Sequence, residues 1–379
     1  MKKIYYLAYY GDRDTENCRN SHPAAELQVL YLVQVLNELG YEVEIVSPSG
    51  VGKVKKFLMY SREYTWQIKK GVRVRYFPSL GSRFKIIPIL CRYWMTIRKL
   101  KQFIKNEIDG TILIYHSTEL YPIYHLLNKM GKEFILEVEE IYADFTGGNR
   151  ELELQEISRA SSYVIPTQLL VPKVTGGKPW VLYHGSCFEE RDFGRNFRDG
   201  RIHIVYAGTL DYRKVGELVA IDVAKYLDNR YYIHILGIGS EEEVEHIKKR
   251  IDSMNNLKCK ISYDGVLYGE EYLSFLQSCD IGLYTQDSPD VVTSFPSKLM
   301  SYLTNGLRIV ANKTPVLECS EIKDLICFSE YNEPESVAEA IRRVDFSISY
   351  DSRGELQRIH QRLKADLKIL LESIEKQKV

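Results

Sequence analysis

One lysine stands at the start of a predicted helix, where a positive charge is unexpected. Lys298 lies in the stretch SFPSKLMSYLTNG, after Pro296 and Ser297 and before apolar residues with helical spacing. The N-terminal end of a helix carries partial positive charge, so a cation there is disfavoured unless an anion binds. Lys298, with Ser294 and Ser297 beside it, is therefore a candidate for binding phosphate. The alternative is a lysine that binds no ligand.

Lys214 occupies a similar position, at the end of another predicted strand-to-helix loop. Small residues in this loop and in a later one would let backbone amides approach phosphate. Two lysines and two helix starts would suit a diphosphate. A solvated lysine and an ordinary tight turn at the glycines remain open as alternatives. The small residues concerned are Gly208, Thr209, Gly237 and Gly239.

Acidic residues follow a predicted strand in the stretch LEVEEIYAD, 136–144. The end of such a strand presents Glu139 or Glu140 where a carboxylate could act as a general base toward a hydroxyl group, with its pKa raised by neighbouring acids. His116 ends the preceding predicted strand. The alternative is that these acids cap the next segment or pair with cations such as Arg150.

The chain is electrically neutral, with 51 basic and 51 acidic residues, yet its basic residues are unevenly placed. Residues 51–105 hold fifteen Lys or Arg and a single acid, Glu63, interleaved with aromatic side chains. This composition suits contact with an anionic membrane surface. A solvated basic surface is the alternative, and nucleic acid is not the partner that we expect.

Composition bounds the class of protein. With 379 residues, of which 45 % are hydrophobic and 27 % charged, the chain suits two globular domains. No segment approaches the roughly 20 apolar residues that span a bilayer, and the N-terminus lacks the pattern of a cleaved signal peptide. Seven scattered cysteines without a Cys-x-x-Cys pair suggest neither a disulfide framework nor a zinc site. We therefore expect a cytoplasmic protein.

The candidate residues need elements that position them, and the pattern along the chain supplies two such sets. Short apolar strands alternate with amphipathic helices up to about residue 186, and again from residue 202. Nearly continuous apolar strands separated by helices predict parallel sheets covered on both faces. The alternating charges of VRVRYF (72–77) predict an edge or half-exposed strand. In such sheets ligands bind beyond the carboxyl ends of the strands, where the candidates fall.

The apolar periodicity lapses across 187–201, which places a domain boundary there. We predict an N-terminal domain at 1–195, a second domain at 196–345, and a C-terminal amphipathic helix at 346–379 that packs back across one or both domains.

Several stretches resemble a known family. NELGYEVEIVSP in the first half, with YIHILGIGS, ISYDGVLYGEEYLSFLQSCDIGLYT and SFPSKLMSYLTNGLRIVA in the second, is similar to nucleotide-sugar glycosyltransferases of the GT-B fold, near family 4. The resemblance covers nearly the whole chain and is most specific over 259–312. It implies two doubly wound Rossmann-like domains facing a central cleft, with the donor nucleotide on the C-terminal domain and the acceptor on the N-terminal domain.

The resemblance also implies roles for individual residues. Gly237 and Gly239 would face the nucleoside, the backbone of GVLYG (265–269), with Val266 and Leu267, would read the base, and Lys214 and Lys298 with Ser297 would hold the diphosphate. The sequence departs from the family at three charged positions. Thr293 and Ser301 stand where the family has paired glutamates, and Thr209 stands where an arginine is common.

The sequence therefore predicts transfer of a sugar from a nucleoside diphosphate sugar, expected to be a uridine one, to a hydroxyl of a glycan or lipid-linked acceptor. The context would be bacterial-type surface polysaccharide or glycan synthesis, at the inner face of the cell membrane if the basic block binds lipid. The lysines would stabilise the leaving diphosphate without a metal, and no cofactor is implied. The alternatives are a catalytically silent nucleotide-sugar-binding partner subunit and, less favoured, a nucleotide-sugar epimerase of the same fold.

Overall fold

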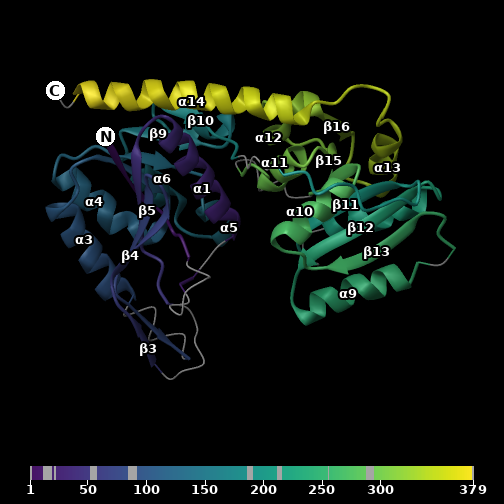
Figure 1. Ribbon diagram of the computed structural model, residues 1–379, viewed down its shortest axis with the longest axis horizontal. Coiled ribbons are helices and arrows are strands. Elements are labelled where there is room, and N and C mark those ends of the chain that lie inside the picture. Colours follow the sequence, from purple (N-terminus) through teal and green to yellow (C-terminus); the bar gives the residue numbers. More distant parts are fainter. Residues whose placement is uncertain are drawn as a thin grey trace. The chain divides into compact units, whose positions relative to one another are not determined.

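The structure is a computed structural model of the chain, and it describes residues 2–11, 19–20, 23–51, 58–83, 92–185, 191–210, 216–254, 256–286 and 294–377. The chain divides into two compact units, the first made of residues 1–185 and 362–379 and the second of residues 186–361 (Figure 1). The sequence placed its domain boundary after Arg195. In the structure, Arg191 and Arg195 pair with Glu270 and Asp280 of the second unit.

Within the described residues of the first unit, eight strands form one sheet in the order β10-β9-β8-β7-β1-β2-β5-β4, in which only β4 runs antiparallel to its neighbour. The strands are β1 (Lys3–Leu7), β2 (Glu42–Ser47), β4 (Tyr64–Lys69), β5 (Val72–Tyr76), β7 (Thr111–Tyr115), β8 (Ile135–Glu137), β9 (Ser162–Ile165) and β10 (Trp180–Leu182). A separate antiparallel pair is formed by β3 (Leu58–Ser61) and β6 (Ser79–Ser82).

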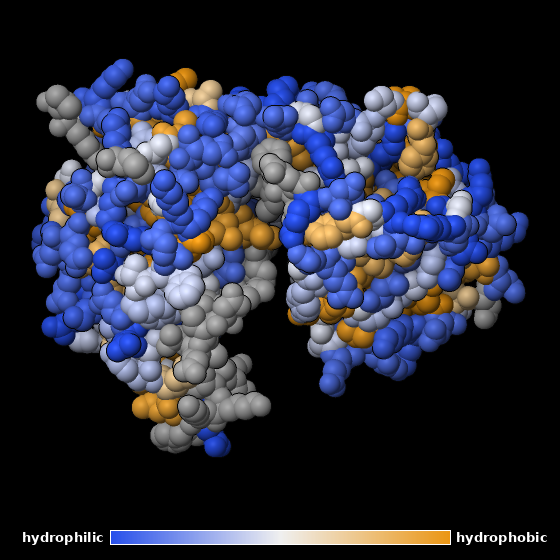
Figure 2. Space-filling model, viewed as in Figure 1, coloured by the Kyte–Doolittle hydropathy of each residue, from blue (hydrophilic) through white to orange (hydrophobic). Residues whose placement is uncertain are grey.

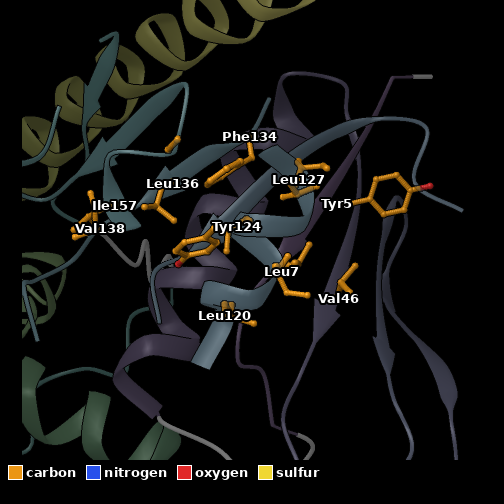
Figure 3. Packing of buried hydrophobic residues seen from close by; sticks show 14 of the residues in the cluster. Tyr5, Leu7, Val46, Leu120, Tyr124, Leu127, Phe134, Leu136, Val138 and Ile157 are labelled. Carbon is orange, nitrogen blue, oxygen red and sulfur yellow. The ribbon is translucent and has the colours of Figure 1, made fainter. Parts of the chain in front are cut away.

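Helices cover both faces of this sheet over its central strands, because β1, β2, β7, β8 and β9 are buried on both sides. They are α1 (Pro23–Glu38), α3 (Ile97–Asn106), α4 (Tyr121–Lys129), α5 (Ala143–Thr146), α6 (Arg150–Ile157) and α7 (Val171–Val174), with a π-helical turn at Arg92–Thr96 and 3₁₀ turns at Thr118–Leu120 and Gln168–Leu170. Figure 3 shows the core on one face, where Leu7 and Val46 of the sheet pack in the same cluster as Tyr124 and Leu127 of α4.

The alternating stretch 72–77 becomes β5, which lies inside the sheet between β2 and β4. Its side chains alternate between buried and half-buried, so of the two predicted alternatives the half-exposed strand is confirmed and the edge strand is not. The reason is Glu44 on β2, which is buried and accepts hydrogen bonds from Arg73 and Arg75. A carboxylate on the neighbouring strand lets two arginines lie within the sheet.

The second unit contains a wholly parallel sheet, and its described strands follow the order β13-β12-β11-β14-β15-β16. They are β11 (Ile202–Thr209), β12 (Tyr231–Ile238), β13 (Lys260–Gly265), β14 (Ile281–Tyr284), β15 (Arg308–Asn312) and β16 (Ile326–Ser329). The helices are α8 (Gly216–Asp222), α9 (Glu241–Asp252), α10 (Gly269–Ser278), α11 (Ser297–Thr304), α12 (Pro315–Glu318) and α13 (Pro334–Arg342), with 3₁₀ turns at Val223–Tyr226 and Lys323–Leu325.

The C-terminal helix α14 (Ser352–Gln377) begins in the second unit and ends in the first. Ser352 Oγ donates a hydrogen bond to the Leu303 carbonyl, and Arg362 donates one to the Leu182 carbonyl. Most of its apolar residues are buried along one stripe, from Leu356 to Ile374. The surface along α14 in Figure 2 is mainly hydrophilic. The helix is thus amphipathic, as its spacing of leucines predicts.

In the parts of the chain that the structure describes, no helix has both the length and the apolar character needed to cross a bilayer.

Candidate functional site

The second sheet changes direction between β11 and β14. From β11 the chain adds β12 and β13 on one side, and it then returns to place β14, β15 and β16 on the other. Loops at the carboxyl ends of two such central strands leave in opposite directions, which opens a crevice where open α/β sheets bind ligands. The carboxyl ends of β11 and β14 are therefore the first place to examine.

Lys298 lies at this point. Its Nζ atom is 4.7 Å from the centroid of the Tyr206 ring on β11 and 5.4 Å from that of Tyr284 on β14. Both distances are within the range of a cation–π contact. A Cβ atom added to Gly208 would lie 2.9 Å from the same Nζ atom, so the ammonium group lies against the end of β11. The structure thus brings together two of the predicted residues, Lys298 and Gly208.

The position of Lys298 follows from the packing of α11. Tyr302 on this helix is fully buried, and its hydroxyl accepts a hydrogen bond of 2.9 Å from the Ala207 backbone N–H. The absence of a side chain at Gly282 makes room for the Tyr302 ring, because a Cβ there would lie 2.3 Å from the ring. Residues four apart share one face of a helix, so fixing Tyr302 against β11 and β14 also directs Lys298 toward the ends of these strands.

The N-terminus of α11 differs from that of α9. Helix α9 has a capping box, in which the Ser240 and Glu243 side chains bond each other's backbone N–H groups. The N-cap of α11 is Pro296, whose side chain makes no capping hydrogen bond. Ser294 and Ser297 are half-buried beside it. Of these two helix starts, that of α11 is the one whose amides are left for an anion.

The predicted glycines lie next to one another at the same sheet edge. Gly208 on β11 is the register partner of Gly237 on β12. A Cβ at Gly237 would lie 2.5 Å from the Gly208 carbonyl oxygen, and one at Gly239 would lie 3.1 Å from Leu210. Close backbone approach therefore requires glycine at 237, and any contact of these residues with a nucleoside stays a prediction.

Apolar side chains are exposed at this edge, over the ends of β12 and β13. The exposed fractions are 54 % for Ile238, 40 % for Val266 and 63 % for Tyr268, and Leu267 is half-buried. Exposed apolar groups beside backbone amides and carbonyls could contact the flat face of an aromatic ligand.

The positions that depart from the family are only partly described. Ser301 is hydrogen-bonded to the Tyr272 hydroxyl of α10, and Thr209 is exposed at the end of β11. Lys214 and Thr293 lie outside the described residues.

In the first unit, His116 follows β7 and is buried. Its Nε2 atom lies 2.9 Å from Glu153 Oε1, and its Nδ1 atom lies 3.3 Å from the Tyr124 hydroxyl. Glu153 also accepts hydrogen bonds from the backbone N–H groups of Tyr142 and Ala143. Burial alone would raise the pKa of Glu153, but these hydrogen bonds, with that of His116, lower it. His116 therefore supports the turn after β8, and its contact with a substrate stays a prediction.

A carboxyl pair follows at the end of β8. Glu137 is buried and accepts a hydrogen bond from the Tyr6 hydroxyl. It is also hydrogen-bonded to Glu139. Glu139 accepts a further hydrogen bond, of 3.0 Å, from Gln28 Nε2. Burial raises the pKa of Glu137 to about 7. Burial and the charge of Glu137 raise that of Glu139 well above its ordinary range. Glu139 therefore holds a proton more tightly than an ordinary carboxyl group, and it must lose this proton before it can act as a base.

Sequence reasoning missed three of these groups. Glu137 was set aside in favour of Glu139 and Glu140, which are both half-buried. The flanking rings of Tyr206 and Tyr284 were also missed, because they are ordinary apolar residues of strands. A signal was present in each case, since all three lie at or near strand ends.

In the described ranges, no three His, Cys, Asp or Glu side chains gather where they could hold a metal ion.

Comparison with known proteins gives the fold its name. No family model matches the chain, and no curated protein is similar to it in sequence. Solved structures are similar over nearly the full length. HepE of Anabaena, in complex with UDP and glucose, has a TM-score of 0.65 and 14 % identity, covering 99 % of this chain and 100 % of that chain.

Two further structures have the same architecture. The structure described as trehalose-6-phosphate from E. coli bound with UDP-2-fluoro glucose has a TM-score of 0.64 and 10 % identity, covering 98 % of this chain and 99 % of that chain. An α,α-trehalose-phosphate synthase (UDP-forming) from Burkholderia xenovorans, in complex with glucose-6-phosphate, has a TM-score of 0.62 and 10 % identity, covering 100 % and 99 %. The predicted α/β class with two Rossmann-like units is confirmed, and the chain has the GT-B fold.

Proposed function

We propose that this protein is a glycosyltransferase that uses a nucleoside diphosphate sugar, with uridine as the nucleoside. The observation that carries the proposal is the position of Lys298 between Tyr206 and Tyr284, at the switch point of a parallel sheet and beside an uncapped helix start. The solved structures of the same fold that hold UDP or a UDP sugar support the choice of donor.

In this proposal the diphosphate lies over the start of α11. Lys298 and the amides of the first turn, with Ser294 and Ser297, would bind it, and Lys214 would add a second cation. Charge on the diphosphate grows as the sugar leaves, so fixed positive groups would stabilise the transition state more than the bound donor. These groups would supply positive charge without requiring a metal ion.

The nucleoside would lie along the ends of β12 and β13. The uracil ring would rest against the exposed apolar side chains there, and the backbone of residues 265–269 would read its polar edge, as the sequence resemblance implies. Gly237 and Gly239 would let the ribose approach the backbone. Ser301 is too short to replace the glutamate that the family has at this position, so fewer charged groups would contact the donor.

The acceptor would be a hydroxyl of a glycan or of a lipid-linked sugar, bound by the first unit. Glu139, Glu140 and His116 are the candidates for positioning or deprotonating this hydroxyl. The pKa of about 7 at Glu137 allows the carboxyl pair to exchange a proton near neutral pH. Synthesis of surface polysaccharide or another glycan is the context that we infer.

An anionic membrane surface is the second partner that we propose, through the basic block at 51–105. Arg73 and Arg75 are paired with Glu44 and are not available to it. Helix α3 has no acid, and Trp94, which is 71 % exposed, precedes it. A groove of about 400 Å³ is lined by Trp94, Ile97, Arg98, Lys101, Gln102 and Lys105. Residues 52–57 and 84–91 of the block lie outside the described residues.

Flotation with liposomes tests this partner. We expect binding to liposomes that contain anionic lipid at low salt, and its loss at high salt, because exposed charges are screened. A variant with Arg98, Lys101 and Lys105 changed to Gln should bind less. If this variant and the wild type float equally, or if binding does not depend on salt concentration, the membrane proposal is wrong.

Calorimetric titration with UDP tests the donor site. Changing Lys298 to Ala should weaken binding by roughly 10- to 100-fold, the effect of losing a charged hydrogen bond of about 1.5–3 kcal/mol. Lys323→Ala is the matched control, since this exposed lysine lies before the amino end of β16, an outer strand of the same sheet. Equal affinities in wild type and Lys298→Ala would contradict the site.

A catalytically silent partner subunit is the second candidate, and Ser301 in place of a charged residue favours it. Incubation with UDP sugars and a set of glycan and lipid-linked acceptors separates the two. An enzyme releases UDP and elongates an acceptor, whereas a silent subunit binds UDP and releases none.

A further inference from the structure

Four titratable side chains form a hydrogen-bonded chain across one face of the second sheet. His203 Nε2 lies 2.9 Å from Asp199 Oδ1, His203 Nδ1 lies 2.9 Å from His234 Nε2, and His234 Nδ1 lies 3.1 Å from Asp264 Oδ2. Both histidines are buried, whereas the two aspartates at the ends are partly exposed. Each ring nitrogen therefore has one partner within the chain.

Counting protons shows what this chain requires. Three hydrogen bonds need three protons, but two neutral imidazoles carry only two. If each imidazole donates to its aspartate, then His203 Nδ1 and His234 Nε2 face each other with lone pairs at 2.9 Å, which is repulsive. A third proton between the two rings resolves this conflict, and the pair then carries one positive charge between two carboxylates.

Aromatic rings surround the pair as they would a cation. The Phe197 ring is stacked on His203 at 4.1 Å and on His234 at 5.0 Å, and the Tyr232 ring is stacked on His234 at 4.0 Å. The negative face of an aromatic ring favours a cation over a neutral group. This arrangement is independent support for a charged histidine pair.

Other polar and charged groups lie around the pair on β13, before β14 and before β11. From β13, Ser262 donates to Asp264, and Lys260 lies over the Tyr232 ring. Asp280, before β14, accepts from the His203 backbone N–H. In the segment before β11, Arg201 lies 3.6 Å from Asp199 and Arg195 pairs with Asp280. Burial lowers the pKa of His203, although the hydrogen bond to Asp199 opposes this, so the shared proton depends on the flanking carboxylates and the surrounding rings.

The chain ends at the loop that is assigned above to the donor base. Asp264 directly precedes Gly265, whose φ of +83° lies in the left-handed region that favours glycine. Gly265 begins the stretch 265–269, with Val266 and Leu267. Fixing the Asp264 carboxylate therefore fixes the direction in which this loop leaves β13.

We propose that the Asp199–His203–His234–Asp264 chain, held together by one proton shared between the histidines, positions the loop 265–269 and makes nucleotide binding depend on pH. This inference rests on the proposed donor site. As pH rises the shared proton is lost, the bond between the histidines breaks, and the loop is released. The affinity for the donor then falls.

Nitrogen-15 NMR of the imidazoles tests the proton directly. At neutral pH we expect three of the four ring nitrogens of His203 and His234 to be protonated, one for each hydrogen bond of the chain. Two protonated nitrogens would overturn the inference. The assignment uses the single variants His203→Gln and His234→Gln, each of which removes one set of signals.

Binding of UDP-glucose between pH 6 and pH 9 tests the function. This diester lacks the terminal phosphate ionisation near pH 6 that complicates UDP. We expect the wild-type affinity to fall about 3- to 10-fold as the shared proton is lost. The profile should be flat in His203→Gln. The control His246→Gln, at an exposed histidine of α9 in the same unit, should follow the wild type. Parallel profiles in all three proteins would overturn the inference.

Deuterium uptake of the 265–269 peptide separates failure of this inference from failure of the donor site. At one pH near neutrality, His203→Gln should exchange faster than His246→Gln. If His203→Gln exchanges faster but the wild type binds no UDP-glucose, the proposed function is wrong, while the positioning of the loop by the histidine pair is supported. If UDP-glucose binds but the two variants exchange alike, the inference fails while the donor site stands.

Discussion

Lys298 Nζ lies against the backbone of Gly208, where a Cβ atom would be only 2.9 Å from it. The two residues come from α11 and β11 and meet at the carboxyl edge of the second sheet. The atom that would be crowded is the far end of a flexible side chain, so a methyl group at 208 can be accommodated by moving the lysine.

The first prediction concerns this contact. Gly208→Ala should fold with a change in stability below about 1 kcal/mol, because the ammonium group can swing away, yet it should bind UDP roughly 10-fold more weakly. Calorimetric titration measures the affinity. The control is the same change in a Lys298→Ala background, where it should have no further effect. Additive losses in the double variant would show that Gly208 acts independently of Lys298.

The second prediction concerns the anchor of α11. Tyr302→Phe removes the hydroxyl that accepts from the buried Ala207 N–H, and leaving a buried donor unpaired costs about 1–3 kcal/mol. We expect faster deuterium uptake across residues 298–306 and weaker UDP binding, since Lys298 shares this helix. The control Tyr226→Phe changes a tyrosine that is 44 % exposed in the same unit. Unchanged exchange in Tyr302→Phe would contradict the anchoring role.

Several candidate residues were expected at one edge of the second sheet for a physical reason. Carboxyl ends of parallel strands must share one edge, so residues after successive strands, such as Gly208, Gly237 and Val266, were expected to lie near one another. The lysine at a helix start was notable because its electrostatics are unfavourable without an anion. Neither argument required knowledge of the register between strands.

What the sequence could not show depends on register and packing. His203 and His234 meet only because Val205 pairs with His234, which places the two rings diagonally on one face. His116 looked available at a strand end, but its partner Glu153 is on a helix far along the chain. Such contacts are set by how helices pack on the sheet, and no local pattern encodes them.

The third prediction concerns Glu44 in the first unit. This buried carboxylate pairs with Lys3, Arg73 and Arg75. Glu44→Gln removes the buried counterion that these three cations share, although Arg75 keeps its contacts with two other carboxylates. We expect a loss of about 2–3 kcal/mol, below the 3–5 kcal/mol of a fully buried pair because the cations are partly exposed. All three tryptophans of the chain lie in the first unit, so tryptophan fluorescence during urea unfolding reports on it.

The stabilisation that Glu44 provides depends on pH. Burial would raise its pKa, but the hydrogen bonds from Arg75, Lys3 and Arg73 hold it below the ordinary value. The folded state therefore binds fewer protons than the unfolded state, and the stabilisation is present above about pH 4.3 and lost as pH falls through the folded pKa. The gap between wild type and Glu44→Gln should close in acid. Glu42→Gln, at an exposed glutamate of the same strand, should show no gap at any pH.

The fourth prediction concerns His184, which is buried after β10 and has its Nδ1 atom 2.7 Å from the Pro166 carbonyl oxygen. Burial lowers its pKa to about 4, since charging the ring there would remove an ion from water. In the unfolded state His184 takes up a proton near pH 6.5, whereas in the folded state it does so only near pH 4. The free energy of unfolding therefore falls as pH drops through this window, by about 3 kcal/mol in total. His184→Asn keeps a donor for Pro166 but does not titrate, so its urea midpoint should depend less on pH over this window. His125→Asn, at a histidine that is 54 % exposed on α4, should keep the wild-type slope. Equal slopes in all three proteins would mean that His184 is not the group responsible for the acid sensitivity of the first unit.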